Sequence, residues 1–286
     1  KWVGMKNFIT FFKSYQFSVT IKNTITLNLN DKTITACEKA FKILADGSNA
    51  GGFLTVMGKG TIDADSKNGV FFLIGSDNSD DNKAAKLVVG ENVNIINSNY
   101  TFWIDSVSRK NVSYNVAVDI YGKVTADEPV YVSGNIHATE GNVPTIYIHS
   151  GAEFNIFGND ELYLAGYAKT TIDPGTKFTN AEGNTVTIAA GELVINGGTF
   201  NAGSTIGGVT GTGGAIDVST SSAVYVQQHT TNLPIKVTVN DGLFTAAIPF
   251  YQETGANAKD GKTSAPQLVD LAISGGTFTS NRSVED

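Results

Sequence analysis

The stretch Ile195-Asn196-Gly197-Gly198-Thr199-Phe200 decides the fold of this 286-residue chain, because it recurs. It returns as Ile273-Ser274-Gly275-Gly276-Thr277-Phe278 and, in weaker form, as Val239-Asn240-Asp241-Gly242-Leu243-Phe244. A fourth copy, Ile172-Asp173-Pro174-Gly175-Thr176-Lys177-Phe178, carries one inserted residue. Self-similarity at a spacing of about 20 to 50 residues is typical of solenoid proteins, in which each repeat packs on its neighbours.

The copies share a strand, a corner and a second strand. An alternating apolar segment such as Glu192-Leu193-Val194-Ile195 precedes the glycines, which turn the corner, and Thr and Phe then begin the next strand. We expect the phenylalanines to stack on those of adjacent coils. They lie at positions 178, 200, 244 and 278, in steps of 22, 44 and 34 residues. These steps predict one coil, two coils, and one coil with a loop insertion.

The N-terminal half follows the same pattern with different residues. The segment from Thr24 to Thr35 (TITLNLNDKTIT) is typical of a strand, an Asn-Asp turn and a strand, and Phe53 to Asp63 (FLTVMGKGTID) repeats it. Insertions interrupt the pattern at 75–83, 203–222 and 254–266, where we expect loops at coil corners. The sequence therefore predicts an all-β fold, a right-handed single-stranded parallel β-helix with loop insertions.

We expect two parts in the chain. Residues 21–286 form the β-helix, which we expect to continue beyond residue 286. Residues 1–20 form an N-terminal cap or attachment segment, because the first coil of a solenoid needs a cover and this segment carries Trp2, Phe8 and Phe17.

Composition limits the partners. The net charge is -7 and the pI is about 5.0, whereas nucleic acid or an anionic membrane would require clustered Lys and Arg. No apolar run is long enough to span a bilayer, so we expect no membrane insertion. Cys37 is the single cysteine, which excludes an intramolecular disulfide and disfavours a cysteine-based zinc site.

Several short stretches resemble a known family. Leu27 to Thr35 (LNLNDKTIT), followed by Gly58 to Asp63 (GKGTID), resembles the opening coils of pectate-lyase-like β-helix proteins. Leu162 to Gly166 (LYLAG), Ala190 to Leu193 (AGEL) and the Gly-Gly-Thr-Phe copies resemble a subgroup found in surface proteins of gut bacteria and in structural (fibre) proteins of their phages. The resemblance implies the fold but no single function, because the family includes lyases, hydrolases, adhesins and fibres.

The residues of an enzyme of this family are not evident. The resemblance implies, for a lyase, clustered calcium-binding aspartates and a basic residue, usually Arg, but Arg109 and Arg282 lie outside any carboxylate-bearing strand pattern. A glycosidase needs two facing carboxylates. The nearest candidates are Asp63 with Asp65 and the adjacent pairs Asp127-Glu128 and Asp160-Glu161, which we interpret as solvated corners. We therefore predict no catalytic residues and no enzyme.

Metal sites and cofactors are not predicted. The loop with Asp77, Asp80 and Asp81 offers oxygen ligands for calcium, but it lacks the later Glu and the turn glycine of a calcium-hand loop, so a solvated turn is the favoured interpretation. The histidines His137, His149 and His229 are isolated in sequence. The first two lie on successive strands where they could meet on one face, but two histidines without a third ligand make a poor metal site.

Aromatic residues give the better indication of function. Tyrosines recur at intervals close to a coil, and aromatic faces beside Asn, Thr and Asp suit sugar rings, whose C–H faces stack while their hydroxyls form hydrogen bonds. The alternative is strand packing. The candidate glycan-binding residues are Tyr100, Trp103, Tyr121, Tyr147, Tyr163 and Tyr167.

Three functions stay open. We favour a non-catalytic surface-display or fibre module, extracellular on a bacterial cell or a phage virion (a head fibre, for example), that binds glycans or a host surface. Such a module would assemble with other subunits, and a homotrimer is one arrangement. The first alternative is a polysaccharide lyase or glycoside hydrolase such as a phage depolymerase. The second is a purely structural virion decoration protein.

Overall fold

The computed structural model describes residues 19–21, 24–36, 41–45, 51–64, 71–76, 84–106, 112–157, 161–205, 221–229, 231–253 and 268–282. Within these ranges the regular elements are strands, and they form three nine-stranded sheets whose pairings are parallel. None of the described residues belongs to a helix long and apolar enough to cross a membrane. The predicted right-handed parallel β-helix is confirmed.

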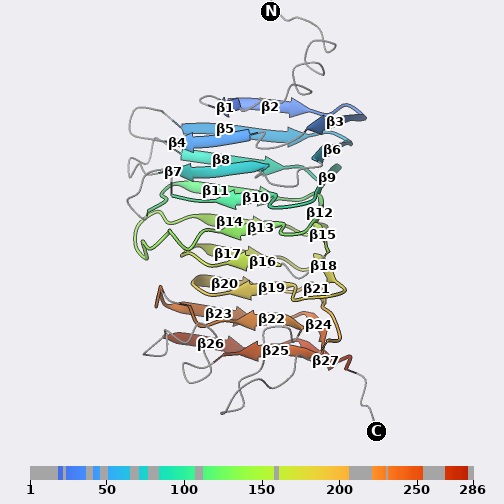
Figure 1. Cartoon of the computed structure of the whole chain (residues 1–286), viewed down its shortest axis with the longest axis vertical. Helices are drawn as coiled ribbons and strands as arrows, with labels where there is room; N and C mark the ends of the chain where they lie inside the picture. Colours follow the sequence, from blue (N-terminus) through green and yellow to red (C-terminus); the bar gives the residue numbers. More distant parts are fainter. Residues whose placement is uncertain are drawn as a thin grey trace, which may run out of the picture.

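The chain visits the three sheets in turn, so three consecutive strands make one coil. Figure 1 shows the coils stacked along the longest axis, with the first strands β1 to β3 at one end of the stack and the last strands β25 to β27 at the other. Each strand pairs with the strands three positions before and after it in the chain, except β1 to β3 and β25 to β27, which are the end strands of the sheets. This connection satisfies backbone groups between coils and leaves one face of each strand pointing inward.

Sheet A contains the first strand of each coil. Its strands are β1 (Val19–Ile21), β4 (Phe41–Ala45), β7 (Phe72–Ser76), β10 (Phe102–Ile104), β13 (Val130–Val132), β16 (Leu162–Leu164), β19 (Val186–Ile188), β22 (Ser222–Val226) and β25 (Ile248–Gln252).

Sheet B contains the second strand of each coil. Its strands are β2 (Thr24–Asn28), β5 (Gly51–Met57), β8 (Ala84–Val89), β11 (Val116–Ile120), β14 (Thr145–Ile148), β17 (Lys169–Ile172), β20 (Gly191–Ile195), β23 (Ile235–Val239) and β26 (Val269–Ile273).

Sheet C contains the third strand of each coil. Its strands are β3 (Lys32–Ala36), β6 (Gly60–Ala64), β9 (Val93–Asn97), β12 (Lys123–Ala126), β15 (Glu153–Ile156), β18 (Lys177–Asn180), β21 (Thr199–Asn201), β24 (Leu243–Ala246) and β27 (Thr277–Ser280).

The core is built from columns of apolar side chains that run along the solenoid. The predicted phenylalanine stack is one of them: neighbouring ring centroids are 4.7 to 4.9 Å apart and the planes are within 10° of parallel. Four of its rings are almost fully buried, and the last is 39% exposed at the end of the final coil. The members are Phe154, Phe178, Phe200, Phe244 and Phe278.

One predicted coil count is wrong. Phe200 and Phe244 are direct partners in the pairing of β21 with β24, so the 44 residues between them make one coil and not two. The excess length comes from the insertion predicted at 203–222, of which residues 206–220 lie outside the described ranges. A solenoid tolerates such an insertion because only the strands have to keep their register.

The corners form as the sequence predicts. Asn30 and Asp31 both have left-handed backbone, with φ of 47° and 56°, and they form the turn between β2 and β3. Gly198 and Gly276, the second glycines of two Gly-Gly-Thr-Phe copies, have φ of 112° and 109°. Glycine adopts this conformation without the penalty that a Cβ atom imposes, so the motif marks the corner before sheet C.

Two predictions fall mainly or wholly outside the described part of the chain. Residues 1–18 of the predicted cap lie there, while residues 19 and 20 belong to β1. The calcium candidates Asp77, Asp80 and Asp81 also lie outside the described residues.

Candidate functional site

The six predicted glycan-binding residues fall into three places. Tyr100, Trp103 and Tyr163 belong to the outer face of sheet A. Tyr121 and Tyr147 lie on and beside the outer face of sheet B, next to His149. Tyr167 lies between the two sheets and is 7% exposed.

The outer face of sheet A carries a column of aromatic side chains. In β10 the flanking Phe102 and Ile104 are fully buried in the core, so Trp103 between them faces outward. Strand pairing places Trp103 beside Tyr131, and Tyr131 beside Tyr163. Because neighbouring strands are about 4.8 Å apart, the pairing alone brings successive rings into contact.

Ring contacts join this column. The centroid of Trp103 is 5.3 Å from that of Tyr131, and Tyr131 is 5.9 Å from Tyr163. Tyr100, which precedes β10, lies 5.1 Å from Trp103 and 5.4 Å from Tyr131. We name Tyr100, Trp103, Tyr131 and Tyr163 the aromatic column. All four side chains are partly exposed, so their rings are open to a ligand.

A depression of about 450 Å³ adjoins the aromatic column. The rings of Tyr131 and Tyr163 form part of its wall, and most of the other lining residues have polar side chains that can form hydrogen bonds. Its described lining consists of Tyr131, Ser133, Gly134, Asn135, His137, Tyr163, Ala165, His229 and Thr231. An apolar wall with a few converging polar groups is the usual form of a small-ligand site.

The outer face of sheet A is closed over the two coils that follow Tyr163. The Tyr163 hydroxyl donates a hydrogen bond to Gln227 Oε1 at 2.8 Å. The next two positions in register, Thr187 and Tyr225, are only 1% and 4% exposed. The face is therefore closed over the two coils next to Tyr163, and it is partly exposed again at Tyr251.

Carboxylates surround the column and raise the pKa of its phenols. Burial is the largest cause of the raised pKa of Tyr131, and Glu128 and Asp105 add to it. For Tyr163 burial is again the first cause, followed by Glu161 and then other groups that include Glu128. Glu128 is 6% exposed, so its interpretation as a solvated corner is wrong: the residue directly precedes Pro129 and the buried strand β13.

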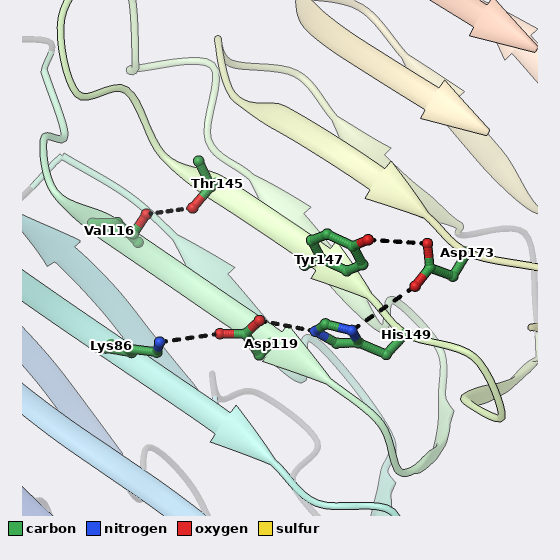
Figure 2. Close-up of polar contacts among 7 residues, drawn as sticks. All are labelled: Lys86, Val116, Asp119, Thr145, Tyr147, His149 and Asp173. Carbon is green, nitrogen blue, oxygen red and sulfur yellow. Dashed lines mark hydrogen bonds and ion pairs between the residues drawn. The ribbon is translucent and has the colours of Figure 1, made fainter. Parts of the chain in front are cut away.

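The second cluster lies where sheet B turns toward sheet C (Figure 2). His149 Nε2 lies 2.9 Å from Asp119 Oδ1, and Nδ1 lies 4.0 Å from Asp173 Oδ2. The imidazole also stacks on Tyr121 and Tyr147, with centroids 3.8 and 4.1 Å apart. The aspartates lie one coil before and one coil after His149, so the cluster joins three coils.

The remaining polar groups of this cluster are engaged with each other. Lys86 Nζ lies 3.5 Å from Asp119 Oδ2, and the Tyr147 hydroxyl donates a hydrogen bond to Asp173 Oδ1 at 3.1 Å. That bond is the main cause of the raised pKa of Tyr147. We name Lys86, Asp119, Tyr121, Tyr147, His149 and Asp173 the corner cluster. Its Tyr and His rings pack on each other, and each of its two carboxylates contacts other members of the cluster.

Tyr167 has a structural position. Its ring is nearly buried, and its hydroxyl donates a hydrogen bond to Glu192 Oε1 at 3.2 Å. Glu192 also forms an ion pair with Lys169, with 3.4 Å between Lys169 Nζ and Glu192 Oε1. Strand packing, the alternative interpretation of the tyrosines, fits this residue.

The histidines lie at two different sites. His137 and His229 line the depression on sheet A, whereas His149 lies in the corner cluster, so His137 and His149 do not meet on one face. Among the described residues, no group of three or more His, Cys, Asp or Glu side chains is arranged to hold a metal ion.

The other acidic and basic residues that the sequence offered as candidates for an enzyme do not lie together among the described residues. Asp63 lies on β6 of sheet C, and Asp127 lies between β12 and β13. Arg282 is exposed after β27. Asp65, Asp160 and Arg109 lie outside the described residues.

No protein-family model, curated protein or solved structure matches the chain. The fold defines its class directly: three parallel sheets, traversed in turn by successive strands, make a right-handed parallel β-helix.

Proposed function

We propose that the chain is a non-catalytic glycan-binding module, displayed on the outer surface of a bacterium or a phage virion. The observation that carries this proposal is the aromatic column beside a depression lined with hydrogen-bonding groups. The short stretches that resemble pectate-lyase-like proteins and the surface and fibre subgroup support the same class of function. We propose further that the module works as one subunit of a larger assembly.

The chemistry of the site suits sugars. The C–H faces of pyranose rings pack on aromatic faces, and their hydroxyls exchange hydrogen bonds with side chains such as Ser133, Asn135 and Thr231 at the edge of the rings. Trp103, Tyr131 and Tyr163 are fixed by a regular sheet, so little conformational entropy is lost when a ligand binds.

The corner cluster is less suited to contact a ligand. Both of its carboxylates contact other members of the cluster, and its rings are stacked on His149. We assign it to the packing of one coil on the next. This divides the predicted tyrosines into a contact set on sheet A and a structural set elsewhere.

A binding and release assay tests the proposal. Purified protein is incubated with a panel of bacterial and mucin-type glycans, and binding and released reducing or unsaturated sugar are recorded in the same wells. Binding without release is the expected result. Release of sugar would show an enzyme and overturn the non-catalytic assignment, whereas no binding to any glycan would favour the structural decoration protein.

Two matched variants locate the site. Tyr131→Ala removes a ring from the aromatic column, and we expect about tenfold weaker binding because one stacked ring contributes up to about 1.5 kcal/mol. Tyr147→Ala removes a partly exposed ring from the corner cluster and should leave the affinity within about twofold. Equal losses in the two variants would contradict the assignment to sheet A.

A further inference from the structure

We infer that the sheet A depression is selective for uncharged sugars and rejects acidic ones such as uronic or sialic acids. The inference rests on the proposed function and names the class of glycan that the same site takes. Its basis is the distribution of charged side chains over the faces of the solenoid.

The described lining of the depression contains no lysine and no arginine. Proteins recognise carboxylate ligands mainly through charge-assisted hydrogen bonds from Arg and Lys, because these offset the loss of the ligand's hydration. Here the lining offers hydroxyl, amide and imidazole groups instead. These groups match the hydroxyls of neutral sugars and the acetamido group of N-acetylated amino sugars.

Carboxylates lie around the aromatic column on several coils. Asp105 directly follows β10, Glu128 lies two residues before β13, and Glu161 directly precedes β16. These three strands carry Trp103, Tyr131 and Tyr163. Glu128 is 6% exposed, and a charge shielded from solvent acts over a longer distance than an exposed one. An anionic sugar placed on the column would therefore be repelled.

The pKa values of the tyrosine hydroxyls in the aromatic column reflect the nearby carboxylates. After burial, Glu128 and Asp105 raise the pKa of Tyr131, and Glu161 and Glu128 raise that of Tyr163. The carboxylates thus disfavour a negative charge on the tyrosine hydroxyls themselves. A ligand carboxylate bound beside those hydroxyls would meet the same repulsion.

The described lysines gather on other faces. The outer positions of sheets B and C carry ion pairs in which Lys86, Lys123, Lys169 and Lys177 face Asp or Glu. Among the described residues in register with Trp103 on sheet A, the one cation is Lys42. It lies two strands before Trp103, which is about 10 Å at the usual strand spacing. It is farther still from the depression beside Tyr131 and Tyr163.

Pairs of glycans that differ only in charge test the inference. We would compare oligogalacturonides with their fully methyl-esterified forms, and sialylated mucin glycans with their desialylated forms, by titration calorimetry at pH 8. In each pair the uncharged member should bind at least tenfold tighter, and the difference should shrink as the salt concentration rises. Tighter or equal binding of the acidic members would overturn the inference while leaving glycan binding intact. Failure of both members in every pair would overturn the proposed function as well.

A gain-of-function variant tests the cause. Asn135→Lys adds a cation to an exposed position in the lining. Loss of the amide affects both members of a pair, so the expected result is that the ratio of acidic to uncharged affinity rises at least tenfold. Asn155→Lys adds the same charge on β15 of sheet C and should change neither affinity. If Asn135→Lys is folded, as judged by an unchanged Tm, and gains nothing over Asn155→Lys, charge does not set the selectivity.

Discussion

Thr170 is a polar side chain in the apolar interior of sheet B. It is 1% exposed, its register neighbours are Ile146 and Leu193, and its Oγ1 has no hydrogen-bond partner among the described residues. A buried polar group without a partner loses its hydration and gains nothing in return. We expect Thr170→Val, which keeps the shape, to raise the free energy of unfolding by about 1 kcal/mol in urea denaturation.

The neighbouring threonine is the control for this change. Thr171 is partly exposed on the outer face of the same strand, so Thr171→Val should shift stability by less than about 0.5 kcal/mol. A loss of stability in Thr170→Val alone would show that the hydroxyl has a partner in the folded protein.

Two poorly solvated phenols predict the behaviour of the protein in alkali. Burial raises the pKa of Tyr163 and Tyr225 above the ordinary value of 10.0, with Glu161 and Glu253 respectively the next causes. Above about pH 10 these phenols ionise in the unfolded chain before they do so in the folded one. The folded state then binds more protons than the unfolded state, so stability is unaffected below pH 10 and falls as the pH rises above it.

Ultraviolet absorbance of the phenolate measures this directly. Among the ten tyrosines of the chain, Tyr163 and Tyr225 should titrate last, and Tyr225→Phe should remove one of these two phenols from the end of the curve. A titration in which every tyrosine ionises near pH 10 in the folded protein would contradict the raised pKa of these two phenols.

Part of the candidate site was predictable at the scale of residues. Composition and tyrosine spacing selected Tyr100, Trp103 and Tyr163, which the structure brings to one face. The sequence did not separate them from Tyr147 and Tyr167, because all of these tyrosines occur in similar strand-like surroundings. Only the strand pairing between coils shows which residues lie on the same face. Because the coils differ in length, this pairing cannot be counted off along the sequence.

The depression and the corner cluster were missed for the same reason. His229 and Asn135 are far apart in sequence and meet only because the coils stack. Asp119, His149 and Asp173 become neighbours across three coils through strand pairing. Aligning the coils on their alternating apolar strands would have placed these residues side by side, and so would have indicated both the depression and the corner cluster.

At the scale of elements, the phenylalanine stack is the strongest feature of sheet C. Phe200 is fully buried between Phe178 and Phe244, so Phe200→Ala should lower the free energy of unfolding by about 3 to 5 kcal/mol. Phe278 contacts Phe244 but is 39% exposed, so Phe278→Ala should lower it by roughly 1 kcal/mol. Chemical denaturation of the two variants measures the difference, and equal losses would mean that the final coil is covered.

The elements themselves were largely predictable. Alternation predicted the strands, and Asn-Asp and Gly-Gly predicted corners that do have left-handed backbone. The spacing from Phe200 to Phe244 was misread as two coils, because a period can be counted only where loops are short. A long insertion changes the distance along the chain and leaves the distance between the rings at 4.9 Å.

At the scale of the whole molecule, the ends of the described solenoid differ from its centre. In the final coil Leu271 and Ile273 occupy core positions but are 37% and 45% exposed, whereas their partners Val237 and Val239 are fully buried. Stability in a solenoid is a sum of contacts between neighbouring repeats, and the described strands of this last coil pair with the coil before it.

Hydrogen exchange should report this gradient. We expect amides in β14, β17 and β20 to exchange slowest and those in β26 and β27 to exchange fastest, because the terminal coils open without unfolding the centre. Uniform protection along the stack would instead mean that the solenoid opens as one cooperative unit.

The common direction of the strand pairing also sets how the protein would respond to force. In all three sheets the hydrogen bonds between coils point along the long axis, so a pull on the two chain ends loads the bonds of one coil at a time. The coils would unfold one after another, and each coil would release its own length of chain. The coil from Phe178 to Phe200 would add about 75 Å of extended chain and the next, from Phe200 to Phe244, about 150 Å, at ~3.4 Å per residue. In a force-extension trace the irregular coil lengths would therefore appear as a sequence of unequal steps.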